Sequence, residues 1–177
     1  ACCVALDAGA ESIVSSASAC GLRGKDYGRP LANDPASAAR ATRGSEAARD
    51  LSEVITPGDL ARTGLEPGTG PRVAWQAPCT LQHGQRLAGR VEALLLAAGC
   101  VLVPTREPTL CCGSAGTYSI LQPELSQELR RRKITALTAG APDVIATANI
   151  GCLEHLRSAS PVPVRHWIEL VAEALDR

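Results

Sequence analysis

The stretch LTAGAPDVIATANIGC (residues 137–152) contains the signals of one complete α/β step. It opens as the end of an amphipathic helix, and Gly140 is placed to stop that helix. The β-branched run at residues 143–148 then predicts a strand, and Cys152 follows in what we expect to be a loop. A helix, a strand and a cysteine in this order predict a parallel sheet with the cysteine beyond one of its strands.

The same order of residues occurs near the start of the chain. LDAGAESIVSSASACG (6–21) aligns with residues 137–152 when Pro142 is treated as an insertion, and RDLSEVI (49–55) aligns with RHWIELV (165–171). Repetition of this kind predicts two related units. We expect an α/β fold with two lobes, the first truncated and the second with a short parallel sheet flanked by helices. The units would be residues 1–63 and 72–177, with a turn-rich linker over residues 64–71.

Hydrophobic patterns predict the remaining elements. In the first unit, Asn33, Asp34 and Pro35 open a predicted helix that runs to about Ile55. The basic run RRRK (130–133) falls inside a helix, where we interpret it as a solvated face that would also suit an acidic partner. In the second unit we expect strands at residues 72–78, 100–104 and 143–148 and helices at residues 81–98 and 123–139.

The composition excludes several classes of function. The chain has 18 basic and 18 acidic residues, and this balance predicts no nucleic-acid or membrane-surface partner. Its longest apolar run, residues 93–98, is too short to cross a bilayer, and no signal-peptide pattern is present, so we expect a cytoplasmic protein. The absence of methionine and a start in mid-helix suggest a piece of a longer protein. The sequence shows no Ser–His–Asp arrangement, so it gives no support to a hydrolytic enzyme.

Four cysteines of the second unit follow predicted strands. Cys79, Cys111, Cys112 and Cys152 have the spacing C-x31-CC-x39-C. Because loops beyond parallel strands meet at one edge of the sheet, we expect these thiols to converge, and converging thiolates select zinc or the iron of iron–sulfur clusters. Adjacent residues tend to point apart, which favours a centre with several irons over one tetrahedral zinc. Gly113 would let its backbone N–H reach a sulfide. Two alternatives to metal binding stay open: the four cysteines could be ordinary core residues, or Cys111 and Cys112 could form a vicinal disulfide.

The remaining cysteines carry weaker predictions. Cys20 is the counterpart of Cys152 in the repeat and is a further candidate metal ligand. Cys2 and Cys3 align with the inside of a helix rather than with a turn, so we do not expect them to bind metal. Cys100 opens a predicted strand and is interpreted as a small core residue.

Four motifs together resemble a known family: CCGSAG (111–116), APCTLQHGQ (77–85), GCLEH (151–155) and KDYGRPLANDP (25–35). They are similar to the iron–sulfur subunit of glycolate oxidase (glycolate dehydrogenase), within the wider group of cysteine-rich CCG domains that includes the cysteine-rich subunit of heterodisulfide reductase and lactate-utilisation proteins. The resemblance implies an electron-transfer subunit that works beside flavin-containing glycolate oxidase subunits, passes electrons towards the quinone pool, and meets the inner face of the membrane only through the complex.

The resemblance also implies a cofactor. It is a cluster of four irons and four sulfides, non-cubane in the heterodisulfide group, held by the four cysteines of the second unit. The broader family motif ends in C-x-x-C, and this chain has His155 at the last position, which makes His155 a candidate ligand through its imidazole. The ferredoxin-like part of the full-length subunit, with its Cys-x-x-Cys-x-x-Cys motifs, has no counterpart in this sequence.

Three interpretations stay open at this point. In the first, the chain carries electrons and has no flavin or substrate-oxidation site of its own. In the second, it is a thiol–disulfide reductase like the heterodisulfide group, and substrate reaches the cluster directly. In the third, it is a scaffold remnant that assembles no cluster.

Overall fold

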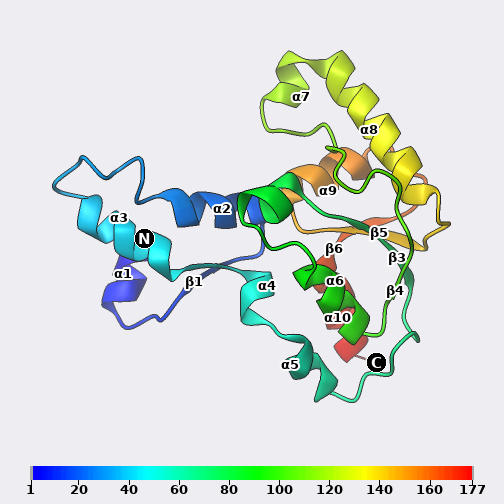
Figure 1. Ribbon diagram of the computed structural model, residues 1–177, viewed down its shortest axis with the longest axis horizontal. Helices are drawn as coiled ribbons and strands as arrows, with labels where there is room; N and C mark the ends of the chain where they lie inside the picture. The colour runs from blue at the N-terminus through cyan, green and yellow to red at the C-terminus, as the bar shows by residue number, and fades with distance from the viewer. Residues whose placement is uncertain (1, 177) are drawn as a thin grey trace.

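The computed structural model describes the backbone of residues 2–176 and the side chains of residues 4–176. One or two helices separate each strand from the next along the chain (Figure 1). In chain order the elements are α1 (Cys2–Asp7), β1 (Ile13–Ser15), α2 (Ser18–Asp26), α3 (Ala38–Ala47), β2 (Ala48–Asp50), α4 (Leu51–Val54), α5 (Pro57–Ala61), β3 (Arg72–Gln76), the π-helical turn η1 (Thr80–Gly84), α6 (Arg90–Ala97), β4 (Val101–Leu102), α7 (Tyr118–Leu121), α8 (Pro123–Thr138), β5 (Val144–Thr147), α9 (Ile150–Arg157), β6 (Val164–His166) and α10 (Trp167–Leu175).

A four-stranded parallel sheet forms the centre of the second unit. Its strand order is β4-β3-β5-β6. The central pair, β3 and β5, runs from Val73 opposite Val144 to Gln76 opposite Thr147. The chain leaves β3 for its neighbour β4 and then returns to β5 on the other side of β3, so the strand order reverses between β3 and β5. Ligands of open α/β sheets bind outside the carboxyl ends of the strands at such a reversal. The α/β fold predicted from the sequence is confirmed.

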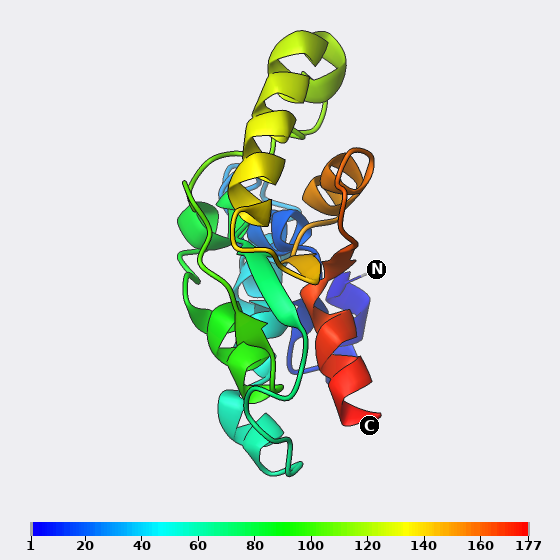
Figure 2. The ribbon, with the colours of Figure 1, turned by 90° about the vertical axis from the view of Figure 1, so that its right-hand side faces the viewer.

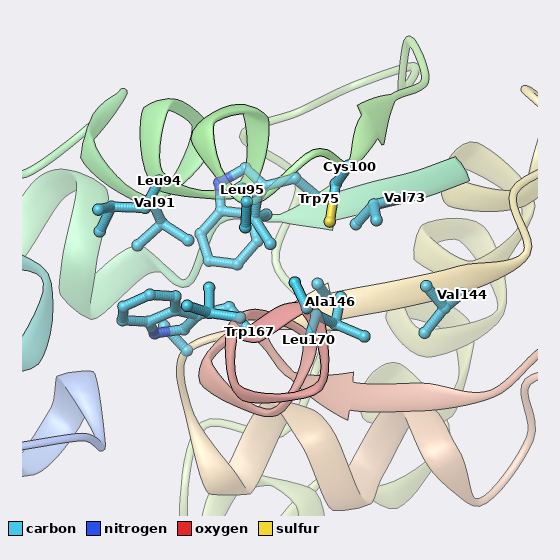
Figure 3. Packing of buried hydrophobic residues seen from close by; sticks show 14 of the residues in the cluster. Val73, Trp75, Val91, Leu94, Leu95, Cys100, Val144, Ala146, Trp167 and Leu170 are labelled. Carbon is cyan, nitrogen blue, oxygen red and sulfur yellow. The ribbon is translucent and has the colours of Figure 1, made fainter. Parts of the chain in front are cut away.

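Helices cover both faces of this sheet. On one face, Val73 and Trp75 of β3 pack with α6 and α10 in a core that includes Trp167 (Figure 3). On the other face, Ala74 and Ile145 pack against α8 and α9. Every residue of β5 is buried, as expected of a parallel strand that is covered on both sides. Beyond the edge of the sheet, α7 and the start of α8 project away from the rest of the molecule (Figures 1 and 2).

The first unit repeats the β5–β6 part of the second unit. Its two strands, β1 and β2, pair in parallel with Val14 opposite Arg49, and Ala146 lies opposite Arg165 in the β5–β6 pair. The sequence repeat aligns these same residues, so both copies have the same register. α2 and α9 also begin at aligned positions. The internal repeat is therefore a structural repeat, and within residues 2–176 β1 pairs with β2 alone.

The helix predicted from Asn33 to about Ile55 is wrong at both ends. Residues 31–37 form turns, and α3 begins only at Ala38 and ends at Ala47. The chain then extends into β2, because hydrogen bonding to β1 stabilises an extended segment there, and a separate short helix, α4, follows. Asp50 caps α4 with its carboxylate, which accepts a hydrogen bond from the N–H of Ser52.

The helix predicted over residues 81–98 is also interrupted. The π-helical turn η1 ends at Gly84, and α6 begins at Arg90. Arg86 and Gly89 between them have φ values of 59° and 84°, and a right-handed helix cannot continue through left-handed residues.

The described residues contain no helix that is both long enough and apolar enough to cross a membrane.

The first unit docks onto the carboxyl edge of the second sheet. The N–H of Ser18, at the start of α2, donates to the carbonyl of Ala148 just beyond β5 (2.9 Å). The hydroxyl of Ser18 lies 2.8 Å from that of Thr80, and the side chain of Gln85 donates to the Ser18 carbonyl (2.9 Å). These contacts place the start of α2 beside the chain segments that follow β3 and β5.

Candidate metal centre

Three chain segments bring four cysteines to one small cavity. Cys79 follows β3, Cys111 and Cys112 follow β4, and Cys152 follows β5, so the segments leave three adjacent strands of the sheet at its carboxyl edge. The space between the side chains is narrow, with a volume of about 10 Å³. Its lining consists of Gln76, Ala77, Cys79, Gln82, Thr109, Leu110, Cys111, Cys112 and Cys152. The donor set is thus four thiols, with neither a carboxylate nor an imidazole in the lining.

The thiols differ in exposure and contact one another. Cys112 and Cys152 are 3% and 5% exposed, Cys111 is half-buried and Cys79 is exposed. The Sγ atoms of Cys112 and Cys152 lie 3.1 Å apart although the residues are 40 positions apart in the sequence. The cavity therefore has a buried side formed by Cys112 and Cys152 and an open side at Cys79.

These contacts shift the thiol pKa values in opposite directions. Contact with Cys112, and then burial, raise the pKa of Cys111. Contact with Cys111 lowers the pKa of Cys112, but contact with Cys152 and burial outweigh this effect and raise it to about 12. Contact with Cys112 lowers the pKa of Cys152. Metal binding at these sulfurs would therefore displace protons, because only thiolates are ligands.

Two of the cysteines lie in helical turns and not in the loops that we expected. Cys79 has helical backbone angles and immediately precedes η1, and Cys152 is the third residue of α9. The first turn of a helix has backbone N–H groups without intrahelical acceptors, and it favours negative charge. The side-chain amide of Asn149, which precedes α9, also donates to the Sγ atom of Cys152 (3.6 Å). The helical placement therefore favours a thiolate at Cys152.

Gly113 is required by packing as well as by its place in the loop. Its φ is +90°, and a Cβ atom added to it would lie 2.3 Å from the backbone oxygen of Ser126 on α8. The hydroxyl of Ser126 donates to the Gly113 carbonyl (2.8 Å), which ties the loop to the helix. The N–H of Gly113 donates to the Sγ atom of Cys111 (3.3 Å). The N–H thus reaches a cysteine sulfur of the site, whereas we expected it to reach a sulfide.

Cys20 and His155 lie outside the cavity lining. Cys20 is exposed in the first turn of α2, at the position that matches Cys152 in α9. The Nε2 atom of His155 lies 3.2 Å from the Ser126 hydroxyl, and burial lowers the pKa of the imidazole. Cys2 lies at the start of α1 with Cys3, and their side chains fall outside the described residues. Cys100 is buried in the core, as its position in the sequence indicates.

Sequence reasoning missed the polar side chains around the cavity. Gln76 and Thr147, the last residues of β3 and β5, are buried, and the hydroxyl of Thr147 donates to the side-chain oxygen of Gln76. Lys133 of α8 is fully buried, so the interpretation of RRRK as a solvated face is wrong for its last residue. Its spacing of four residues from Leu129 and from Leu137 was a signal that it shares their inward side of the helix.

The described residues do not form a ready site for a single metal ion. No three or more His, Cys, Asp or Glu side chains there are arranged to hold one metal ion. The four thiols share a cavity without forming a ready-made site for a single ion, so the zinc alternative gains no support from their arrangement. Soft thiolate donors from several segments are the ligands of iron–sulfur clusters, and by this chemistry the donor set fits such a group.

The part of the chain that contains the cavity matches a known family. Residues 73–157 match the family model CCG, described as a cysteine-rich domain. This part of the chain is a CCG domain. It extends from β3 to the end of α9 and contains all four cysteines of the cavity. The CCG domain therefore includes the three strands whose carboxyl ends form the site.

Similar proteins share more than the CCG domain with this chain. The glycolate oxidase iron-sulfur subunit of Escherichia coli (strain K12) is 46% identical over 173 residues, which are 98% of this chain and 42% of that protein. A probable glycolate oxidase iron-sulfur subunit of Bacillus subtilis (strain 168) is 30% identical over 148 residues, 83% of this chain and 33% of that protein. Lactate utilization protein A of Bacillus licheniformis is 27% identical over 175 residues, 92% of this chain and 70% of that protein. The chain thus spans less than half the length of either glycolate oxidase subunit.

Proposed function

We propose that this chain is the part of a glycolate oxidase iron–sulfur subunit that holds one iron–sulfur cluster through Cys79, Cys111, Cys112 and Cys152. The observation that carries the proposal is the meeting of four thiols, from three separate segments, in one cavity at the carboxyl edge of the CCG-domain sheet. The 46% identity to the Escherichia coli subunit supports the assignment to glycolate oxidation. Cys20 and His155 are not part of the proposed ligand set, because neither lines the cavity.

The bound cluster would supply one-electron transfer. The chain's own contribution is to hold the cluster, to exclude water from its Cys112–Cys152 side and to donate hydrogen bonds to ligand sulfurs from Gly113 and Asn149. The donor set and the family favour a cluster of four irons and four sulfides, the non-cubane form included. The exposed Cys79 marks the side by which electrons enter or leave.

The proposed partners are flavin-containing subunits of the same complex. Substrate oxidation would take place on those subunits, since the described cavity is lined by cysteines and uncharged side chains and has no room for a flavin. The complex would work in the cytoplasm, at the inner face of the membrane, and would deliver electrons towards quinone.

Iron and acid-labile sulfide analysis of the 177-residue chain, purified and reconstituted without oxygen, tests the proposal. We expect about four irons and as many sulfides per chain, with broad visible absorbance. Serine at any of the four cavity cysteines should reduce the iron content sharply. The matched controls are Cys20→Ser and His155→Gln, which should load as the parent chain does.

Three results would contradict parts of the proposal. A colourless wild-type chain without iron would favour the scaffold interpretation. Loss of iron in Cys20→Ser or His155→Gln would show that the ligand set is wrong. Reduction of an added disulfide substrate by the loaded, reduced chain would favour the heterodisulfide-type reductase over an electron carrier.

A further inference from the structure

A lysine with no exposed surface lies next to the proposed cluster site. Lys133 of α8 is 0% exposed, whereas Arg131 and Arg132 before it are exposed. Its ammonium group donates to the backbone carbonyls of Pro108 (2.9 Å) and Glu107 (3.3 Å). These carbonyls belong to the loop that leads into Cys111 and Cys112. A charged group buried in this way is costly unless an opposite charge or several hydrogen bonds offset its desolvation.

The charges that face Lys133 are those of the cavity cysteines and of Glu107. Burial lowers the pKa of Lys133, and electrostatic attraction to the sulfurs of Cys112, Cys111 and Cys152, and then to Glu107, opposes this effect. The carboxylate of Glu107 is already paired with Arg132 (3.1 Å) at the surface. The two hydrogen bonds to carbonyls satisfy the donors of Lys133 only in part, and neither brings a full negative charge.

We propose that Lys133 is an electrostatic positioning residue: its buried ammonium is the counter-charge of the thiolate-bound cluster, and it raises the reduction potential of that cluster. This inference rests on the proposed function. Four thiolates gather negative charge in a partly buried cavity, and a positive charge held near them by the 107–108 carbonyls offsets it. Charge and hydrogen bonding around the sulfurs are the means by which proteins tune cluster potentials.

The direction of the effect follows from the charge balance of the electron transfer. An external one-electron reductant, such as dithionite in a titration, gives one electron to the oxidised cluster and is itself oxidised. The cluster becomes more negative by one unit, and no bond to Lys133 forms or breaks. A fixed positive charge stabilises the reduced form more than the oxidised form, so removal of the charge should make reduction harder.

Redox titration of three variants of the whole chain tests this role. Lys133→Met removes the charge at similar side-chain length, and Lys133→Arg keeps the charge. Arg131→Met removes the same charge from an exposed position two residues away, where Arg131 pairs with Glu128. In Lys133→Met the ratio of reduced to oxidised cluster at a fixed potential should fall about tenfold, a shift of the midpoint by about 59 mV to lower potential for a one-electron couple. Lys133→Arg and Arg131→Met should titrate as the wild-type chain does.

The outcomes separate this inference from the proposed function. If the wild-type chain takes up no iron, the proposed function has failed first. If the wild-type chain and Lys133→Met both load and share one midpoint potential, the role of Lys133 is refuted. Lys133→Met could keep the circular dichroism spectrum of the wild-type chain and yet bind no cluster. In that case, cluster binding by Lys133→Arg supports the role of the positive charge. Failure of Lys133→Arg as well would overturn it, because the shape of lysine and not its charge would then be required.

Discussion

Replacement of Gly113 by alanine tests how the cysteine loop is held against α8. The added Cβ atom would lie 2.3 Å from the Ser126 carbonyl oxygen, a separation that must open to at least 3.0 Å. Overpacking of this kind costs about 1–3 kcal/mol. The left-handed φ of +90° adds about 1–2 kcal/mol for a residue with a Cβ atom. Together these effects are a large part of a typical stability of about 5–15 kcal/mol.

The matched control lies three residues further along the same loop. Gly116 also has a positive φ, of +61°, but an added Cβ atom would meet nothing within 4 Å. Gly116→Ala should therefore cost only the backbone part, about 1–2 kcal/mol. Urea unfolding of the iron-free variants, followed by circular dichroism, gives both losses without interference from the cluster. Equal losses in Gly113→Ala and Gly116→Ala would refute the steric argument, since an added Cβ atom would meet Ser126 and Leu129 at Gly113 and nothing at Gly116.

Three further predictions concern other parts of the molecule. Gly44→Ala in α3, where an added Cβ atom meets nothing within 4 Å, should raise the free energy of unfolding by about 0.5–1 kcal/mol, measured by urea unfolding. In the iron-free chain, mild oxidation with diamide should link Cys112 to Cys152, whose sulfurs are 3.1 Å apart, and peptide mapping without reduction that finds another first disulfide would contradict this. Partial burial raises the pKa of Glu53, but its hydrogen bond from Lys25 contributes to a net lowering. The stability that Glu53 adds is therefore present above its unfolded pKa of about 4.3 and lost as the pH falls through the lower folded value, so Glu53→Gln should flatten the acid side of a plot of stability against pH.

The parts of the fold that the sequence predicted well are those that local patterns control. The strands around Val73 and Val144 and the helix opened by Pro123 have continuous apolar or periodic residues and clear boundary residues. The repeat predicted that the first unit would have the same local structure as part of the second. The strand pairs β1–β2 and β5–β6 do have the same register. By contrast, β2 has only three residues, and its extended conformation depends on pairing with β1, which no local pattern reveals.

For the site, too, the sequence predicted some features and not others. The order of four cysteines, each placed after a strand, determined the candidate ligands and the edge of the sheet where they lie. Their mutual distances, the burial of Cys112 and Cys152 and the exclusion of Cys20 and His155 from the lining depend on how three segments pack together.

Lys133 shows why sequence alone was insufficient. In the run RRRK it has the same charge as its neighbours. Its spacing from Leu129 and Leu137 indicates an inward side of the helix, but not which groups its ammonium contacts. The tertiary structure places α8 so that this one ammonium faces the carbonyls of residues 107 and 108, which lie 26 and 25 positions earlier in the chain. The sequence thus determined the α/β repeat and the thiols, because these depend on local periodicity and residue chemistry. Only the tertiary structure decided which charge is buried beside the thiols, because burial depends on contacts between distant segments.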